Sequence, residues 1–226
     1  MGRTDLAEKV EQVVDPGGWS KAAVVVCRAG PGRIAVKDTR RMNGLVRFFY
    51  GRWVQWREIR VLRRLEGVTG VPRFYGRIDA QAFAMEWVDG VHLNRGIARG
   101  RFASIFRSLE TTIRSVHARG VVHLDLHEKK NILITPDDQA FLLDFATALY
   151  LGGLGLPGRL AVRLLGRLDG AALLKFKGRF APELLTPRER RRLRWLTWLT
   201  RLWIPKRLAD LLKELGSWLG LRHRQP

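Results

Sequence analysis

The stretch from His123 to Phe145, HLDLHEKKNILITPDDQAFLLDF, decides the fold of this chain. It contains two short apolar runs on either side of the turn residues Pro-Asp-Asp-Gln, a pattern that predicts a hairpin of two short strands. Asp125 and Asn131 precede the first strand, and Asp144 follows the second. Two carboxylates and one carboxamide are therefore expected to converge at one edge of the hairpin.

Phosphoryl transfer from Mg-ATP requires this set of groups. One carboxylate orients the acceptor hydroxyl, while an amide and a second carboxylate hold the magnesium ion. Each residue taken alone is better explained as a surface Asp, a capping Asn or a turn Asp. Their order along the chain and their placement on a hairpin favour a phosphotransfer site.

The stretch resembles the catalytic and metal-binding loops of the protein kinase-like superfamily, H-x-D…N followed by D-F-G. The resemblance implies that Asp125 is the base or orienting residue and that Asn131 and Asp144 bind magnesium. The sequence departs from the pattern in two places. Five residues instead of four separate Asp125 from Asn131, and Ala146 replaces the Gly of D-F-G. The longer loop favours a catalytically inactive module as one alternative.

The N-terminal part of the chain contains the expected nucleotide clamp. Residues 8–14, 22–27 and 34–38 are predicted strands, and the last of them, IAVKD, resembles the kinase V-A-I-K strand. The resemblance implies that Lys37 contacts the ATP phosphates. A helix is predicted over 46–65, with Trp53, Trp56 and Ile59 on its apolar stripe. Glu58 is its only carboxylate and would be the ion-pair partner of Lys37.

Two further segments are expected to contact ATP. The turn that contains Gly17 and Gly18 would lie over the phosphates, where glycine permits close backbone approach; an ordinary hairpin turn explains it equally well. Residues 74–79 and 82–88 predict a hairpin. In kinase-like proteins its second strand leads into the hinge, so the resemblance implies adenine contacts from the backbone of Glu86, Trp87 and Val88, with Met85 as gatekeeper.

A second helix is predicted over residues 105–117, with one apolar stripe, and Gly120 ends it just before the catalytic loop. His123 is expected to hold the loop by hydrogen bonds. No cluster of His, Cys or acidic residues has zinc-ligand spacing, so magnesium is the expected metal.

Composition limits the class of protein. The 226 residues are 46% hydrophobic, which is sufficient for a globular core, and the single Cys27 suits a reducing compartment. No signal peptide and no run long enough to span a bilayer are recognised, so a cytoplasmic location is expected. The net charge of +20 is concentrated in the last third of the chain and indicates an anionic membrane, an acidic substrate or nucleic acid as a partner.

From Pro187 onward the chain predicts an amphipathic helix. One face is basic and the other is rich in Trp and Leu, a pattern typical of a helix in a membrane interface and also of one that closes a core. The basic face comprises Arg190, Arg194, Thr197 and Arg201; the apolar face comprises Leu193, Leu196, Trp198, Leu199, Leu202 and Trp203. Nucleic acid is disfavoured, because the aromatic residues lie in apolar periodic contexts rather than among exposed basic strand residues.

These observations predict an α+β, two-lobed kinase-like fold, with a β-rich ATP-binding lobe over residues 1–88 and a reduced helical lobe over 89–226. The chain most resembles the small bacterial lipopolysaccharide-core sugar kinases (Kdo and heptose kinases) and the minimal RIO-type kinases. That resemblance implies Mg²⁺-dependent transfer of the ATP γ-phosphate to an envelope sugar hydroxyl by a protein at the inner face of the cytoplasmic membrane. Protein serine or threonine is the alternative acceptor, and an inactive module that binds membrane or nucleic acid is the second alternative.

Overall fold

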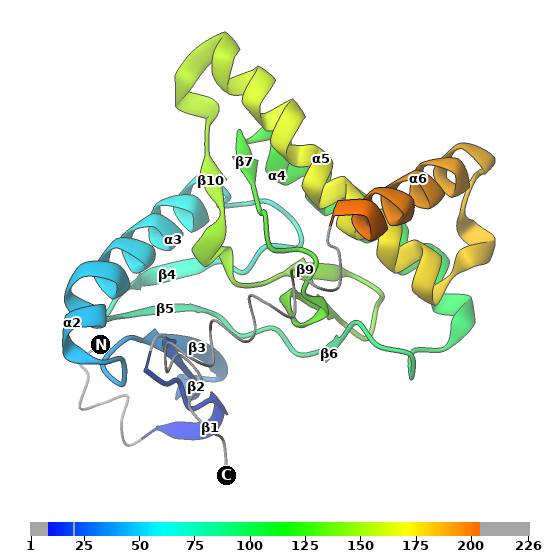
Figure 1. Ribbon diagram of the computed structural model, residues 1–226. Coiled ribbons are helices and arrows are strands. Elements are labelled where there is room, and N and C mark those ends of the chain that lie inside the picture. Colours follow the sequence, from blue (N-terminus) through cyan, green and yellow to red (C-terminus); the bar gives the residue numbers. More distant parts are fainter. Residues whose placement is uncertain (1–8, 20, 204–226) are drawn as a thin grey trace, which may run out of the picture. The chain divides into compact units, whose positions relative to one another are not determined.

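The computed structural model describes residues 9–19 and 21–203 (Figure 1). The chain divides into two compact units, residues 1–173 and 174–226, and each is described by itself. Helices and antiparallel sheets occur together in the first unit, so the expected α+β class is confirmed. The predicted lobe boundary at residue 88 differs from this division and stays a prediction.

A five-stranded antiparallel sheet forms the N-terminal part of the first unit. Its central strands are rich in apolar residues, and Val26 and Phe83 are among its fully buried side chains. The strand order is β1-β2-β3-β5-β4. The strands run β1 (Val10–Asp15), β2 (Ala23–Ala29), β3 (Gly32–Asp38), β4 (Phe74–Arg77) and β5 (Ala82–Glu86).

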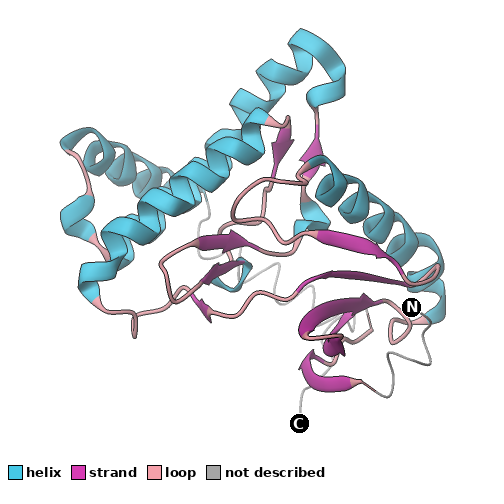
Figure 2. Cartoon of the chain, turned by 180° about the vertical axis from the view of Figure 1, so that it is seen from behind, coloured by secondary structure: helices cyan, strands magenta, loops and turns pink. Residues whose placement is uncertain are grey.

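One helical segment packs beside this sheet and contacts β4 (Figures 1 and 2). It consists of α2 (Gly44–Val46), a π-helical turn (Arg47–Gly51) and α3 (Arg52–Arg64). The predicted helix is confirmed, but its predicted stripe is partly wrong, because Trp53 and Trp56 are half exposed. The guanidinium groups of Arg57 and Arg60 lie over their rings, 4.2 and 5.3 Å from the centroids, which stabilises the two indoles at the surface.

The hairpin predicted between Asn131 and Phe145 and the helix predicted before it are confirmed as secondary structure. β8 (Ile132–Ile134) and β9 (Ala140–Leu142) pair antiparallel, and β6 (Val91–His92) adds a third strand. Helix α4 (Phe102–Ala118) buries the predicted apolar stripe. After α4, β7 (Val121–Val122) pairs with β10 (Leu149–Tyr150), which places the entrance to the catalytic loop beside the segment that follows Asp144.

Two helices follow β10. The 26-residue α5 (Gly155–Phe180) was not predicted, whereas α6 (Pro187–Trp203) agrees with the amphipathic helix expected after residue 186. Within the second unit Trp195 and Trp198 are each 58% exposed, so neither indole is packed in a core. Among the described helices, none has the length and apolarity needed to cross a bilayer. Residues 204–226 of the predicted basic tail lie outside the described residues.

Candidate active site

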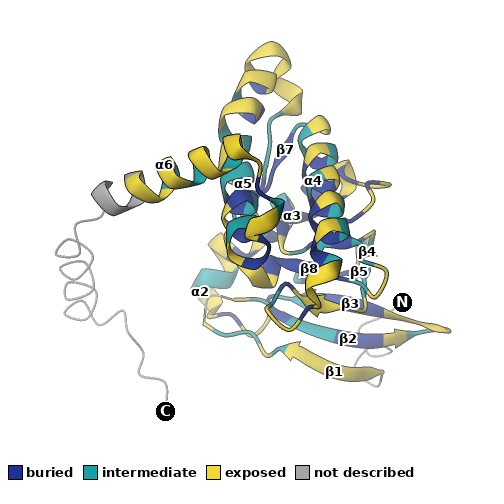
Figure 3. Ribbon diagram, turned by 90° about the vertical axis from the view of Figure 1, so that its right-hand side faces the viewer, coloured by how far each residue is buried: buried dark blue, intermediate teal, exposed yellow. Residues whose placement is uncertain are grey.

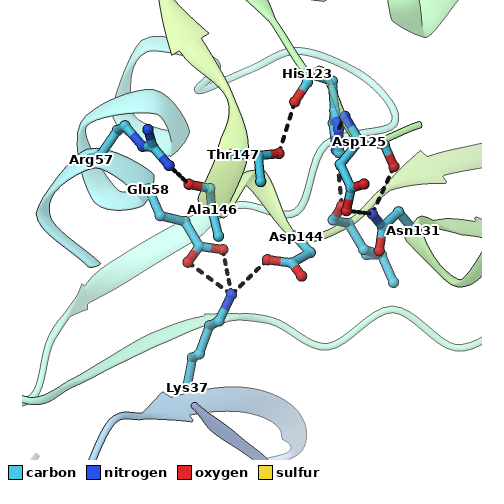
Figure 4. A network of polar contacts seen from close by, with 10 residues as sticks. Lys37, Arg57, Glu58, His123, Asp125, Asn131, Asp144, Ala146 and Thr147 are labelled. Atoms are coloured by element: carbon cyan, nitrogen blue, oxygen red, sulfur yellow. Dashed lines mark hydrogen bonds and ion pairs between the residues drawn. The ribbon is translucent and has the colours of Figure 1, made fainter. Parts of the chain in front are cut away.

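Lys37 lies at the centre of an ion cluster built from three distant parts of the chain (Figure 4). β3 supplies Lys37, α3 supplies Glu58, and the segment after β9 supplies Asp144. The Lys37 Nζ lies 2.8 Å from Glu58 Oε2 and 2.9 Å from Asp144 Oδ1. The predicted partnership between Lys37 and Glu58 is therefore present as geometry, and Asp144 shares the same ammonium group.

Burial and charge together set the protonation of this cluster. Burial would lower the pKa of Lys37, but the carboxylates of Glu58 and Asp144 outweigh it and raise that pKa above its ordinary value. Burial would raise the pKa of Asp144, but the Lys37 ammonium and hydrogen bonds hold it below its ordinary value. Lys37 is therefore charged and Asp144 ionised at neutral pH.

The loop between β7 and β8 brings Asp125 and Asn131 together. The Asn131 Nδ2 group donates to the Asp125 carboxylate at 2.9 Å and to the Asp125 carbonyl, also at 2.9 Å. A 3-10 turn over Lys129–Asn131 ends the loop. The five-residue spacing therefore leaves the carboxylate and the amide in direct contact.

Histidine side chains flank Asp125 on both sides in the sequence. His123 is fully buried; its Nε2 lies 3.0 Å from the Leu143 carbonyl, and its Nδ1 lies 3.3 Å from the Asp125 backbone nitrogen. It holds the loop, as the sequence predicted. His127, in contrast, is two-thirds exposed, with Nδ1 3.2 Å from Asp125 Oδ1. His127 was not predicted as part of the site.

The role of Asp169, on α5, was not predicted from the sequence. Its carboxylate is 1% exposed and accepts hydrogen bonds from the backbone N–H groups of His123 and Leu124, both at 2.9 Å. His117 on α4 lies 2.9 Å from the same carboxylate. Leu124 has a left-handed backbone, with φ of 69°, which a leucine adopts only when its surroundings hold it there. Asp169 therefore fixes the entrance to the catalytic loop.

Two further contacts join the segment after Asp144 to its neighbours (Figure 4). The Arg57 guanidinium donates to the Ala146 carbonyl, which connects α3 to the residue that replaces the Gly of D-F-G. The Thr147 hydroxyl donates to the His123 carbonyl at 3.1 Å. The ion cluster and the catalytic loop are therefore parts of one connected network.

A cavity of about 470 Å³ opens beside the ion cluster, within the range of small-molecule sites. Lys37, Glu58, Asn131 and Asp144 line it, together with Met85 and the three predicted hinge residues Glu86, Trp87 and Val88. The Trp87 indole donates to Asp89 at 2.9 Å, and Asp89 pairs with Arg33, so both ends of the hinge are tied to the sheet.

The predicted phosphate loop lies at the edge of this cavity. Asp15 and Lys21, on either side of the turn, line the cavity, whereas Gly17 and Gly18 are not among its described lining residues. Gly17 has φ of 73° and donates its N–H to Asp15 Oδ1, so a tight turn explains this glycine. A role for the two glycines in phosphate binding stays a prediction.

Asn131 and Asp144 have the chemistry that a magnesium ion requires. Mg²⁺ binds one or two protein oxygen ligands together with phosphate oxygens and water, and an ionised carboxylate is its preferred protein ligand. Asp144 is ionised, and both residues line the same cavity as Lys37. The residues present therefore fit a Mg-nucleotide.

Comparison with curated proteins finds similarity to bacterial serine/threonine-protein kinases. PknH of Mycobacterium tuberculosis is 37% identical over 100 residues, which cover 41% of this chain and 16% of the relative. PknE of the same species is 34% identical over 100 residues, covering 41% of this chain and 18% of the relative. The chain thus matches less than a fifth of the length of these relatives. No family model matches the chain.

The fold and these relatives support one class, the protein kinase-like superfamily. The relatives named are serine/threonine-protein kinases, which correspond to the alternative acceptor of the sequence analysis and not to its first choice of an envelope sugar.

Proposed function

We propose that this protein is a Mg-ATP-dependent kinase that transfers the γ-phosphate to a serine or threonine hydroxyl of a protein. The observation that carries the proposal is the position of Lys37, whose ammonium group contacts both Glu58 and Asp144 at the wall of the cavity. An ammonium group held between an anchoring carboxylate and a metal-binding carboxylate is what phosphate binding in kinases requires. The names of the similar proteins favour the protein acceptor.

Each residue has one role in this proposal. Lys37 contacts the phosphates of ATP and is positioned by Glu58, while Asn131 and Asp144 hold the magnesium ion. The hinge backbone at Glu86, Trp87 and Val88 contacts adenine. Asp125 orients the acceptor hydroxyl and accepts its proton. Bound Mg²⁺ would neutralise charge on the phosphates of ATP, and the Lys37 ammonium would stabilise the negative charge that develops on the transferred phosphoryl group.

An envelope sugar is the second candidate acceptor, with the protein attached to the inner face of the cytoplasmic membrane. It is favoured by the exposed indoles of Trp195 and Trp198, which lie among the arginines of α6, because Trp and Arg together suit a membrane interface. An inactive module is the remaining alternative, since the catalytic loop is one residue longer than the kinase pattern. The 2.9 Å contact between Asn131 and Asp125 argues for the active form.

The test is incubation with γ-labelled ATP and Mg²⁺, with separate samples of bacterial protein and of lipopolysaccharide, scored for label in each. Label on serine or threonine is expected. The matched control is Asp125→Asn, which should lower turnover by about a hundred- to ten-thousandfold with ATP affinity intact. Label in the sugar fraction alone would contradict the protein acceptor and support the envelope sugar. No labelling, or equal labelling by the Asn variant, would contradict the catalytic role of Asp125.

A further inference from the structure

The N-terminal half of α5 carries a row of exposed leucines. In Figure 3 much of this part of the ribbon is yellow, the colour of exposed residues. The residues are spaced by four, so they lie along one side of about three turns. We call this row the α5 leucine face: Leu156 (77% exposed), Leu160 (58%), Leu164 (49%) and Leu168 (58%).

A row of arginines runs beside the α5 leucine face. Arg159, Arg163 and Arg167 are all exposed, and they too are spaced by four. Asp169 is the one acid of α5, and it is buried and accepts hydrogen bonds from the backbone of the catalytic loop. Among the described residues, none of the three arginines is paired with a carboxylate. The surface is therefore apolar along its centre and purely cationic along one edge.

The opposite side of α5 already has its packing partners. Val162, Asp169 and Ala172 are buried there. Leu160 and Asp169 are nine residues, or about two and a half turns, apart, which places them on opposite sides of the helix. The α5 leucine face is therefore additional to the apolar surface that the fold uses, and contiguous exposed apolar surface of this kind marks an interaction site.

The positive charge of the arginine row indicates what kind of partner can bind the α5 leucine face. Two copies of the chain docked through it in a symmetric manner would bring arginine rows together without acids to neutralise them. A strict spacing of four also drifts around the helix and does not form the alternating seam of a coiled coil. An anionic bilayer supplies hydrocarbon for the leucines and phosphate for the arginines, as interfacial amphipathic helices require.

We propose that the α5 leucine face is a docking surface for an anionic phospholipid bilayer. The leucines enter the boundary between headgroups and acyl chains, and Arg159, Arg163 and Arg167 contact lipid phosphates. The same helix holds the peptide groups of His123 and Leu124 through Asp169 on its other side. The membrane would therefore lie about one helix diameter from the entrance to the catalytic loop. This docking does not depend on phosphotransfer, so it can fail or succeed independently of the proposed function.

The test is co-sedimentation of the full chain with vesicles of phosphatidylcholine alone and of phosphatidylcholine with phosphatidylglycerol in a two-to-one ratio. Binding is expected for the anionic vesicles only, and it should weaken as salt rises above 0.1 M, where the Debye length is about 10 Å. Leu160→Ser/Leu164→Ser should reduce partitioning by about a hundredfold. Arg159→Gln/Arg163→Gln/Arg167→Gln should also reduce it by about a hundredfold.

Two controls separate this surface from general charge and from α6. The triple variant of Arg95, Arg99 and Arg107 to Gln removes the same charge from exposed positions elsewhere and should leave binding within about twofold. Arg190→Glu/Arg194→Glu/Arg201→Glu tests α6 in the same assay. Binding that survives the α5 variants and is lost in the α6 variant would overturn the proposal.

Thermal melting and ATP binding show whether the α5 variants are still folded. Because the leucines are exposed, the α5 variants should melt and bind ATP as the parent protein does. Failure of anionic vesicles to bind the parent protein at low salt would also overturn the proposal. If the double leucine variant then melted at a lower temperature, the face would be covered by protein, and sedimentation equilibrium would show whether a second copy covers it.

Discussion

Glu58 and Asp169 are two buried carboxylates that the fold stabilises in different ways. Glu58 is 2% exposed and lies 2.8 Å from an ammonium group, which also contacts Asp144. Asp169 is 1% exposed and accepts two backbone N–H groups, with a histidine ring as its third contact. The first carboxylate is compensated mainly by the Lys37 ammonium group, together with a backbone hydrogen bond from Phe145, and the second mainly by two backbone N–H groups of the loop.

Under the proposed function this difference distinguishes a site that rearranges when nucleotide binds from one that does not. Lys37 has two carboxylate partners and would transfer part of its interaction to the nucleotide phosphates. The N–H groups of His123 and Leu124 have one buried acceptor, Asp169, and with it they hold a left-handed leucine in place. We therefore expect substitution of Glu58 to affect catalysis more than stability and substitution of Asp169 to affect stability directly.

The largest expected effect is on activity at the Lys37–Glu58 pair. Lys37→Ala and Glu58→Ala should each lower kcat/KM by about a hundredfold or more, because Glu58 acts only by positioning the lysine on the phosphates. The double variant should lose no more than either single one, which is a strongly non-additive cycle. Steady-state kinetics on all four proteins measures this. Losses that simply multiply would show that the two residues act independently.

A smaller effect is expected on stability at Asp169. Asp169→Asn keeps the shape but replaces one acceptor oxygen by an NH₂ group, so one buried N–H of the loop loses its partner. The free energy of unfolding should fall by about 2–3 kcal/mol in urea titration. For Glu58→Gln the free energy of unfolding should fall by less, about 1 kcal/mol, because the amide keeps an acceptor oxygen and Asp144 still pairs with Lys37.

The exposed Glu183 gives a matched control, since Glu183→Gln removes an acid that the fold does not bury. Its free energy of unfolding should stay within about 0.5 kcal/mol of the parent value. Equal losses for Glu58→Gln and Asp169→Asn would remove the distinction between the two carboxylates.

The sequence was informative where residue type and chain order act together. Asp125, Asn131 and Asp144 lie beside predictable short strands, and Lys37 lies on a predictable strand after three apolar residues, so their convergence could be anticipated. Glu58 could be assigned because it is the only acid on its helix. These predictions required only local periodicity and a known order of motifs.

The sequence was less informative where both faces of a helix are apolar. In α5, leucines occupy the exposed side, while Val162 and Ala172 occupy the buried side, and several glycines weaken the helical signal. Asp169 is a single acid in a run rich in Leu, Gly and Arg. Its isolation was the available sign that it has a buried structural role. The half-exposed Trp53 and Trp56 show the same limit, because hydrophobicity alone does not reveal that arginines will cover their rings.

The smallest expected effect is a pH dependence at His123, which belongs to the loop that Asp169 holds. Burial lowers the pKa of His123 below its ordinary value of 6.5, although the Leu143 carbonyl acts in the opposite direction. The unfolded chain therefore takes up this proton more readily than the folded protein. Stability from this group is complete above pH 6.5 and is lost as pH falls below it, by up to about 1.4 kcal/mol at pH 5.5.

Urea titrations at pH 8 and pH 5.5 measure this loss, and His123→Gln isolates it. Glutamine can place an amide nitrogen near the position of Nε2 and donate to Leu143, but it does not titrate. The variant should be less stable than the parent at pH 8, and its further loss at pH 5.5 should be smaller by about 1 kcal/mol. All other side chains are the same in both proteins, so the difference between the two losses is assigned to position 123. An identical loss in both proteins would mean that His123 accepts its proton in the folded state, and the loop would then be held by an imidazolium ion instead of a neutral ring.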